Sequence, residues 1–410
     1  MSAENLAGLK KMKNILLAFI AILLGLITIS GQTIAFKNVN VIPMNKEQIL
    51  LNQTVLFHKT SISEKSKNAQ ANDDAPIDAK TCLEVIDKTI KLVNDNYVFP
   101  EIAKQIETSL RKKIQNGECN KTTSSIEFAK ILTNYLQEIN HDKHFAVEFS
   151  QESISEPTDS TPTPEAAKKR REKLRQDLAY GNYGFRKVER LSGNIGYLEL
   201  TEFVNAEFGG ETVASAMNFL HDTNALIIDL RDNDGGRPDM IALLTSYFFE
   251  GGAIQLTGIF SRSINQIRES WTSPFVSGKK YLDKDIYILT SNQTISAAEA
   301  FTYNLKLLKR ATIIGETTAG AANPGAIFRV NEHFSVFIPT GRAVNPLTNT
   351  NWEGIGITPD IKVSAAEALK VAHITALEKV LEKSSDETFK KNIKELIEKL
   401  KNQPVQQHSN

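Results

Sequence analysis

The sequence has little cysteine and no excess of charge of either sign. Among 410 residues there are 2 cysteines, and 48 lysines and arginines balance 48 aspartates and glutamates. A balanced charge gives no electrostatic reason for a nucleic-acid partner, and none is expected. The cysteines and the 7 histidines also lack the spacing of a metal site, so neither a metal nor an organic cofactor is expected.

The first 35 residues combine a basic start with an apolar run. Lys10, Lys11 and Lys13 precede residues 15–29, which are almost all apolar, and small and polar residues follow. This order is typical of a secretory signal. An uncleaved membrane anchor is the alternative, although the run is shorter than the roughly 20 residues of a membrane span. Either way, the rest of the chain is expected to be exported, to the periplasm or cell envelope.

Cys82 and Cys119 fit an exported protein. An oxidising compartment permits a disulfide, and an even number of cysteines leaves no odd thiol. Both lie in a region of helical pattern, so either a bridge between neighbouring helices or two buried free thiols is compatible with the sequence.

The hydrophobic pattern divides the chain into segments. Apolar residues recur at helical spacing from residue 79, and short, nearly all-apolar runs alternate with amphipathic helices from residue 195. Such runs are typical of strands covered on both faces, so the pattern predicts an α/β core. The expected segments are a signal peptide or anchor (1–35), a linker (36–77), an N-terminal helical domain (78–149), a connector (150–183), the core (184–363) and C-terminal helices with a tail (364–410).

Ser296 lies between a predicted buried strand and the helix that follows it. A hydroxyl at a helix N-terminus meets oriented N–H groups that could also stabilise a developing oxyanion, as acyl transfer requires. However, Ser296 and Glu299 match a capping box, in which the serine only caps the helix. The octapeptide alone leaves both interpretations open.

A second motif, Asp229-Leu-Arg-Asp-Asn233-Asp-Gly235-Gly236, follows the predicted strand 225–230. It is therefore expected at the carboxyl edge of the sheet, where α/β proteins place their sites. Paired glycines let the backbone approach a ligand closely. The structural alternative is a tight turn in which Asp229 and Arg231 form an ion pair.

A serine nucleophile needs a base. His141 and His144 lie at the junction between the helical domain and the core, whereas the other histidines fall on helices, in a hairpin turn or near the ends. Spacing alone does not choose between these two.

Several motifs together resemble the C-terminal-processing (tail-specific) serine protease superfamily, over about residues 79–363. The branch is that of interphotoreceptor retinoid-binding protein modules, with tricorn protease as a more distant relative. The motifs, in the family's order, are Asn96-Tyr97-Val-Phe-Pro100, Asp142-Lys143-His144, Asp229 to Gly236, Thr294-x-Ser296-x-Ala298-Glu299, Gly315-Glu316-x-Thr318-x-Gly320, and Glu353-Gly354-x-Gly356.

The resemblance implies a crotonase-like ββα core and a serine peptidase site. It puts the nucleophile on Ser296, the general base on His144 and the residue that orients the base on Glu353. The N–H groups of Ala297 and of the Gly235-Gly236 turn would form the oxyanion hole. Asn233 and Asn323 are expected to shape the groove for a peptide or protein substrate.

Three departures from the family qualify this expectation. Where many relatives carry a catalytic lysine, this chain reads Gly320-Ala321-Ala322, and where tricorn has a serine before the base it has Lys143. No stretch has the length or glycine pattern of a PDZ domain. The retinoid-binding relatives carry apolar ligands, so a binding protein for lipid- or retinoid-like ligands is the alternative function, followed by a non-catalytic envelope binding protein.

Overall fold

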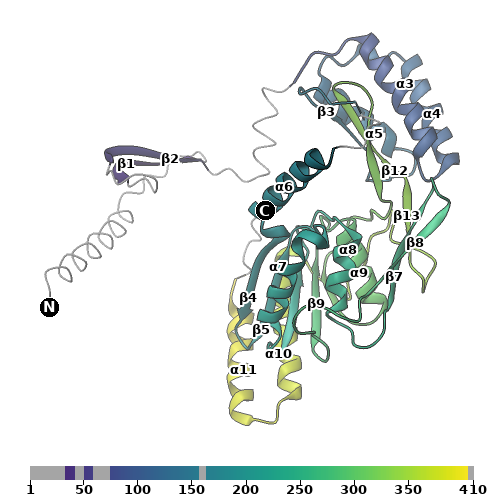
Figure 1. Ribbon diagram of the computed structural model, residues 1–410. Coiled ribbons are helices and arrows are strands. Elements are labelled where there is room, and N and C mark those ends of the chain that lie inside the picture. The colour runs from purple at the N-terminus through teal and green to yellow at the C-terminus, as the bar shows by residue number, and fades with distance from the viewer. Residues whose placement is uncertain (1–32, 42–49, 59–73, 157–162, 405–410) are drawn as a thin grey trace. The chain divides into compact units, whose positions relative to one another are not determined.

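The computed structural model describes residues 33–41, 50–58, 74–156 and 163–404 (Figure 1). The chain forms two compact units, residues 1–74 and 75–410. In the first, β1 (Thr33–Val41) pairs antiparallel with β2 (Leu50–His58). β1 begins in the last three residues of the predicted signal or anchor, and the rest of the pair lies in the segment predicted as a linker. Nearly all of the expected signal or anchor lies outside the described residues. Within the ranges above, no helix combines the length and the apolar character needed to cross a membrane.

Three helices begin the second unit. Asp78 and Ser124 accept the N–H groups of Thr81 and Glu127, and these caps begin the first and third helices. Pro100 occupies the first turn of the second, where its missing N–H costs nothing. The elements are α3 (Ala79–Asn96), α4 (Pro100–Gln115), the 3-10 turn η1 (Glu118–Asn120) and α5 (Ser125–Gln137), all within the predicted helical domain 78–149.

A disulfide joins Cys82 on α3 to Cys119 in η1, so the structure forms the bridge rather than two free thiols. The two cysteines are 37 residues apart in the chain. A link across a loop of this length restricts the unfolded chain, and this stabilises the fold by about 3–4 kcal/mol. Replacing both cysteines with serine is therefore expected to lower the free energy of unfolding by about that amount, measured by urea unfolding followed by circular dichroism.

Reduction provides the control for this prediction. A reducing agent should destabilise the unmodified chain by the same amount as the double replacement and leave the double variant unchanged. A variant as stable as the unmodified chain would contradict the stabilising role of the bridge.

A three-stranded antiparallel sheet covers these helices. Its strands are β11 (Gly325–Arg329), β12 (Phe334–Pro339) and β3 (Ala146–Phe149), in that order. One face packs on the helices through the buried side chains of Val147 and Val336, which pair across the sheet. Since His144 lies two residues before β3, this sheet also fixes the position of that histidine.

The centre of the second unit is a six-stranded sheet with helices on both faces. Four neighbouring strand pairs are parallel, and only the β4–β5 pair is antiparallel. The strand order is β14 (Ile361–Lys362), β10 (Thr312–Gly315), β9 (Asp285–Thr290), β6 (Ala225–Asp229), β5 (Ile195–Leu200) and β4 (Phe185–Leu191).

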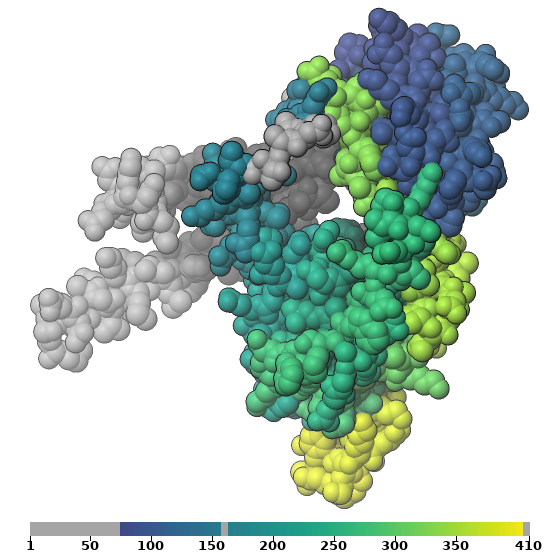
Figure 2. All heavy atoms as spheres, turned by 45° about the vertical axis from the view of Figure 1, so that its right-hand side comes forward, coloured from purple at the N-terminus to yellow at the C-terminus, as the bar shows by residue number. Residues whose placement is uncertain are grey.

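Strand β6 shows how the sequence produces this layering. All five of its residues are buried, as expected of a strand covered on both faces. Leu226 and Ile228 face one helical layer, and Ala225 and Ile227 face the other. The first layer contains α7 (Ala206–Leu220), α8 (Pro238–Ser246) and α9 (Ala297–Leu307), and the second contains α10 (Ala365–Lys383) and α11 (Glu387–Asn402). Figure 2 shows α10 and α11, in yellow, at the end of this unit opposite the purple N-terminal helices.

The remaining elements lie outside these layers. The sequence predicts a helical turn or exposed connector at residues 168–175, and the structure forms a full helix, α6 (Pro164–Tyr180), with no buried residue. The 3-10 turn η2 (Asn182–Gly184) follows it. A third sheet has the order β13 (Gly341–Val344), β7 (Gln255–Ser261) and β8 (Gln266–Trp271). The turns after β6 and β9 leave the central sheet at its carboxyl edge, and the candidate site is built there.

Candidate active site

Ser296 lies on a sharp turn between β9 and α9. Its backbone has φ 57° and ψ −115°, a combination that side-chain-bearing residues rarely adopt. Such strain persists only where surrounding contacts impose it, and it is concentrated at functional sites. One contact is the Ser296 N–H, which donates to Glu299 Oε2 at 2.9 Å. The predicted capping box of Ser296 and Glu299 is therefore present, and the serine hydroxyl also lies 3.3 Å from His144 Nε2.

Glu299 holds the nucleophile turn against the loop that follows β10. The carboxylate is fully buried and also accepts hydrogen bonds from Thr318 Oγ1 at 2.5 Å, Gly320 N–H at 2.7 Å and Ala321 N–H at 2.9 Å. Burial raises the pKa of Glu299, and these hydrogen bonds oppose the rise because they favour the anion. A single carboxylate therefore fixes both the Ser296 backbone and the neighbouring loop.

Replacing Glu299 with glutamine is expected to destabilise the chain by about 1–3 kcal/mol. Glutamine has an NH₂ group in place of one carboxylate oxygen, and this group cannot accept the two hydrogen bonds that the oxygen receives. Urea unfolding would measure this loss. Glu367→Gln is the matched control, since Glu367 occupies the same capping-box position at the start of α10 but is exposed. Equal, small effects of the two replacements would contradict the proposed role of Glu299.

The paired-glycine turn packs directly on Ser296. Gly235 has φ 93°, and a Cβ at this position would lie 2.8 Å from the Ser296 Cβ, so only glycine fits. Its N–H donates to Asn233 Oδ1 at 2.9 Å, whereas Asn233 Nδ2 donates to the Leu200 carbonyl at 2.7 Å. Among the described residues, no hydrogen bond is recorded for the N–H of Gly236 or of Ala297. Of the two glycines, Gly236 is therefore the one whose N–H is available.

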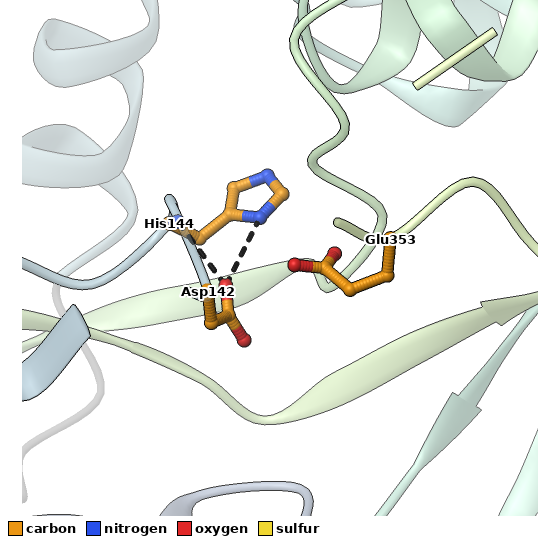
Figure 3. A group of neighbouring side chains, drawn as sticks. All are labelled: Asp142, His144 and Glu353. Carbon is orange, nitrogen blue, oxygen red and sulfur yellow. Dashed lines mark hydrogen bonds and ion pairs between the residues drawn. The ribbon is translucent and has the colours of Figure 1, made fainter. Parts of the chain in front are cut away.

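His144 reaches Ser296 from the loop between α5 and β3. Its ring stacks on Phe337 of β12 at a centroid distance of 6.1 Å, and its side chain is only 11 % exposed. With Nε2 facing the serine hydroxyl, the other ring nitrogen, Nδ1, points inward, where Asp142 Oδ1 lies 3.7 Å away (Figure 3). Among the described residues, Nδ1 makes no hydrogen bond.

Asp142 is fixed by other groups. Its Oδ1 accepts the His144 backbone N–H at 3.2 Å, and its Oδ2 accepts the Tyr97 hydroxyl at 3.0 Å and Asn323 Nδ2 at 2.9 Å. Burial and the charge of Asp142 raise the pKa of Tyr97, so the phenol remains a donor. This fully buried carboxylate is a rigid part of the site that the sequence motif contained without indicating its role.

Glu353 is the second carboxylate beside the same histidine, and Figure 3 shows it next to Asp142 on the side of the ring that carries Nδ1. Its Oε2 accepts the Ala322 N–H at 2.5 Å, and its buried Oε1 has no hydrogen-bond partner among the described residues. Burial and, next, the negative charge of Asp142 raise the pKa of Glu353 to about 7, although the Ala322 N–H and His144 lower it. This carboxyl therefore holds its proton to a higher pH than an ordinary glutamate does.

The three side chains also have the ligand types of a metal site. Potential ligand atoms of Asp142, His144 and Glu353 lie within 4.8 Å of one another. Tetrahedral zinc needs such atoms about 3.3 Å apart. The spacing of these three side chains is therefore wider than that of zinc ligands, and it fits an imidazole that lies between a serine and carboxylates.

The structure brings together Ser296, Ala297, Gly236, His144 and Glu353, which come from four separate parts of the chain. The two asparagines expected to shape the substrate groove are both fully buried, Asn233 inside the glycine turn and Asn323 against Asp142. Lys143, which replaces the tricorn serine, donates to the Ala319 carbonyl. Sequence reasoning missed the roles of Asp142 and Phe337, and for Asp142 the only signal was its place two residues before the histidine.

Family models match two parts of the chain. Residues 194–363 match peptidase family S41, and residues 79–180 match the N-terminal domain of peptidase S41 in eukaryotic IRBP. Together the two matches cover more than half of the chain. The chain therefore belongs to peptidase family S41.

Individual relatives have a sequence identity to this chain of about 30 % or less. The chain is 28 % identical over 172 residues to carboxyl-terminal-processing peptidase 2, chloroplastic, of Arabidopsis thaliana, over 41 % of this chain and 32 % of that protein. It is 30 % identical over 178 residues to the carboxy-terminal-processing protease of Bartonella bacilliformis, over 42 % of this chain and 40 % of that protein. The matched part is thus well under half the length of these relatives. Among solved structures, tricorn protease matches at 14 % identity and a TM-score of 0.47, over 90 % of this chain and 41 % of that chain.

Proposed function

We propose that this chain is a serine peptidase that hydrolyses peptide bonds through an acyl-enzyme on Ser296. The observation that carries the proposal is the 3.3 Å approach of His144 Nε2 to the Ser296 hydroxyl, on a strained turn at the start of α9. A nucleophile and base within or near hydrogen-bond reach is the geometric signature of covalent acyl transfer.

The reaction follows from these contacts. His144 Nε2 takes the hydroxyl proton as Ser296 Oγ attacks the carbonyl carbon, and the imidazolium then gives that proton to the leaving amine. The N–H groups of Ala297 and Gly236 are the donors proposed for the oxyanion, since no internal partner is recorded for them among the described residues. Water then hydrolyses the acyl-enzyme with His144 again acting as base.

Glu353 is the proposed orienter of His144. In the tautomer whose Nε2 accepts the serine proton, Nδ1 carries a hydrogen and needs an acceptor. Glu353 Oε1 and His144 Nδ1 are both buried atoms without partners among the described residues. One carboxylate oxygen of Glu353 and one ring nitrogen of His144 lie within 4.8 Å of each other. A small closure satisfies both atoms at once, whereas the Asp142 oxygens already accept three other donors.

The proposed enzyme acts outside the cytoplasm. The disulfide Cys82–Cys119 supports an oxidising compartment such as the periplasm or cell envelope, and the basic and apolar start of the sequence supports export. The substrate is a peptide or protein. The proposal includes a crotonase-like core without a PDZ domain, as the family resemblance implies.

A fluorophosphonate probe tests the activated serine. Incubation of the purified chain with the probe, followed by mass spectrometry of its peptides, is expected to locate the label on Ser296. Ser296→Ala should abolish labelling, and Ser263→Ala, at an exposed serine in the turn between β7 and β8, should not change it. Labelling elsewhere or label retained in Ser296→Ala would contradict the mechanism. An unlabelled chain that binds retinol or a fatty acid would favour the apolar-ligand carrier instead.

A further inference from the structure

A hollow of about 230 Å³ lies directly beside His144. Its lining combines the imidazole and the apolar side chains of Ala146, Ile327 and Phe337 with the polar residues Lys143, Glu148 and Ser335. An apolar cavity of about 150 Å³ is enough to bind benzene. The hollow therefore has room for a large apolar side chain.

Strand register explains why these residues share one surface. Phe337 pairs with Ala146 on one side and with Ile327 on the other, and residues directly opposite each other project from the same face of a sheet. The neighbouring pair, Val147 and Val336, projects from the opposite face into the helical core. The hollow thus lies on the outer face of the sheet β11–β12–β3, and Ile327 is 68 % exposed there.

The position of His144 identifies which part of a substrate reaches this surface. The imidazole must deliver its proton to the nitrogen of the departing amine, so the residue that carries that amine lies next to the imidazole. The proposed oxyanion donors, Ala297 and Gly236, belong to the nucleophile turn and the glycine turn instead. A hollow walled by His144 and by the strand that follows it is therefore on the amine side of the scissile bond.

We propose that this hollow binds the side chain of the substrate residue on the amine side of the scissile bond and that it selects leucine, phenylalanine or a similar apolar residue. The inference rests on the proposed peptidase function and adds its specificity. Lys143 contributes to the lining, and its ammonium group is occupied by the Ala319 carbonyl. Glu148 is the other charged lining residue, so an acidic substrate side chain is disfavoured.

Selectivity between matched substrates tests the proposal. Two internally quenched peptides would differ only in leucine or glycine on the amine side of the cleaved bond, and an activated acyl ester would lack any residue there. Burial of a leucine side chain is expected to raise kcat/KM by about 10–100-fold over glycine. Ile327→Ser should lower this leucine-to-glycine ratio by about tenfold, because it removes one apolar wall and leaves His144 and its stacking partner in place.

The chain provides a matched control for that replacement. Ile267 is also an isoleucine on an exposed edge strand, β8, and it does not line the hollow. Ile267→Ser is expected to leave both the leucine-to-glycine ratio and ester hydrolysis unchanged. Partition of the acyl-enzyme between water and an added amine gives a second measurement, since leucinamide should intercept it about tenfold better than glycinamide.

The outcomes separate this proposal from the function on which it rests. Ester hydrolysis with a leucine-to-glycine ratio near one, or a ratio that Ile327→Ser does not change, would overturn the specificity hollow and leave the peptidase intact. A chain that neither hydrolyses the ester nor reacts with the fluorophosphonate would overturn both.

Discussion

Ser296→Ala, His144→Gln and the double variant are each expected to lower kcat for peptide hydrolysis by the same factor, about 10⁵–10⁶. The serine attacks only while the imidazole takes its proton, so removing either partner removes the step that both perform. The 3.3 Å contact between Ser296 Oγ and His144 Nε2 is the basis of this coupling. Single-turnover hydrolysis of a quenched peptide by the three variants would measure it.

Non-additivity is the decisive part of this experiment. Two residues that act independently would give a double variant whose loss is the product of the single losses, and that result would contradict the serine–histidine pair. Ser263→Ala is the activity control, and urea unfolding of each variant would exclude loss of the fold as the cause. Residual activity above the rate in water is expected to persist through the oxyanion donors.

The central sheet was largely predictable from the sequence. Residues 225–230 and 286–290 read as short, nearly all-apolar runs and correspond to β6 and β9, because a strand buried on both faces has few polar positions to blur its pattern. Strands β3 and β4 were missed for physical reasons. β3 has only four residues, and β4 is an edge strand with several exposed side chains, so neither carries a clear hydrophobic period.

The site was predictable only through the family resemblance. Ser296 and His144 are 152 residues apart, and no local spacing rule connects residues that the fold brings together over such a separation. The glycine turn shows that the sequence also cannot assign individual N–H donors within a motif. The family resemblance implied one oxyanion donor from the Gly235-Gly236 turn without choosing between the two glycines, and only the structure reveals that Asn233 already accepts the N–H of Gly235.

Glu353→Gln is expected to lower kcat/KM by about 10²–10⁴, because an amide carries no negative charge to stabilise the imidazolium and its NH₂ can select the unreactive tautomer. The replacement should also change the pH dependence. The pKa of Glu353 is raised to about 7, so its carboxylate forms as the pH rises through 7, and the unmodified chain should gain activity there. The variant should lack this part of the gain.

The free energy of unfolding provides an independent test of the raised Glu353 pKa, because it should fall over the pH range in which activity rises. The folded chain holds the Glu353 proton more tightly than the unfolded chain, whose glutamate titrates near 4.5. The stabilising contribution is therefore fully present below pH 4.5 and is lost as the pH rises through about 7. Urea unfolding between pH 4.5 and 8 should give a free energy that falls more steeply in the unmodified chain than in Glu353→Gln.

Asp142 is the competing acceptor, and its replacement decides between the two carboxylates. If Asp142 receives the His144 Nδ1 proton, Asp142→Asn should reproduce the full loss of kcat/KM, and Glu353→Gln should change it little. If Glu353 is the acceptor, Glu353→Gln alone should remove the rise in activity near pH 7. The exposed Glu152→Gln controls for the loss of one negative charge. The expected result follows from the hydrogen bonds, because three donors hold Asp142 in place while Glu353 Oε1, buried and without a partner among the described residues, can turn to the imidazole.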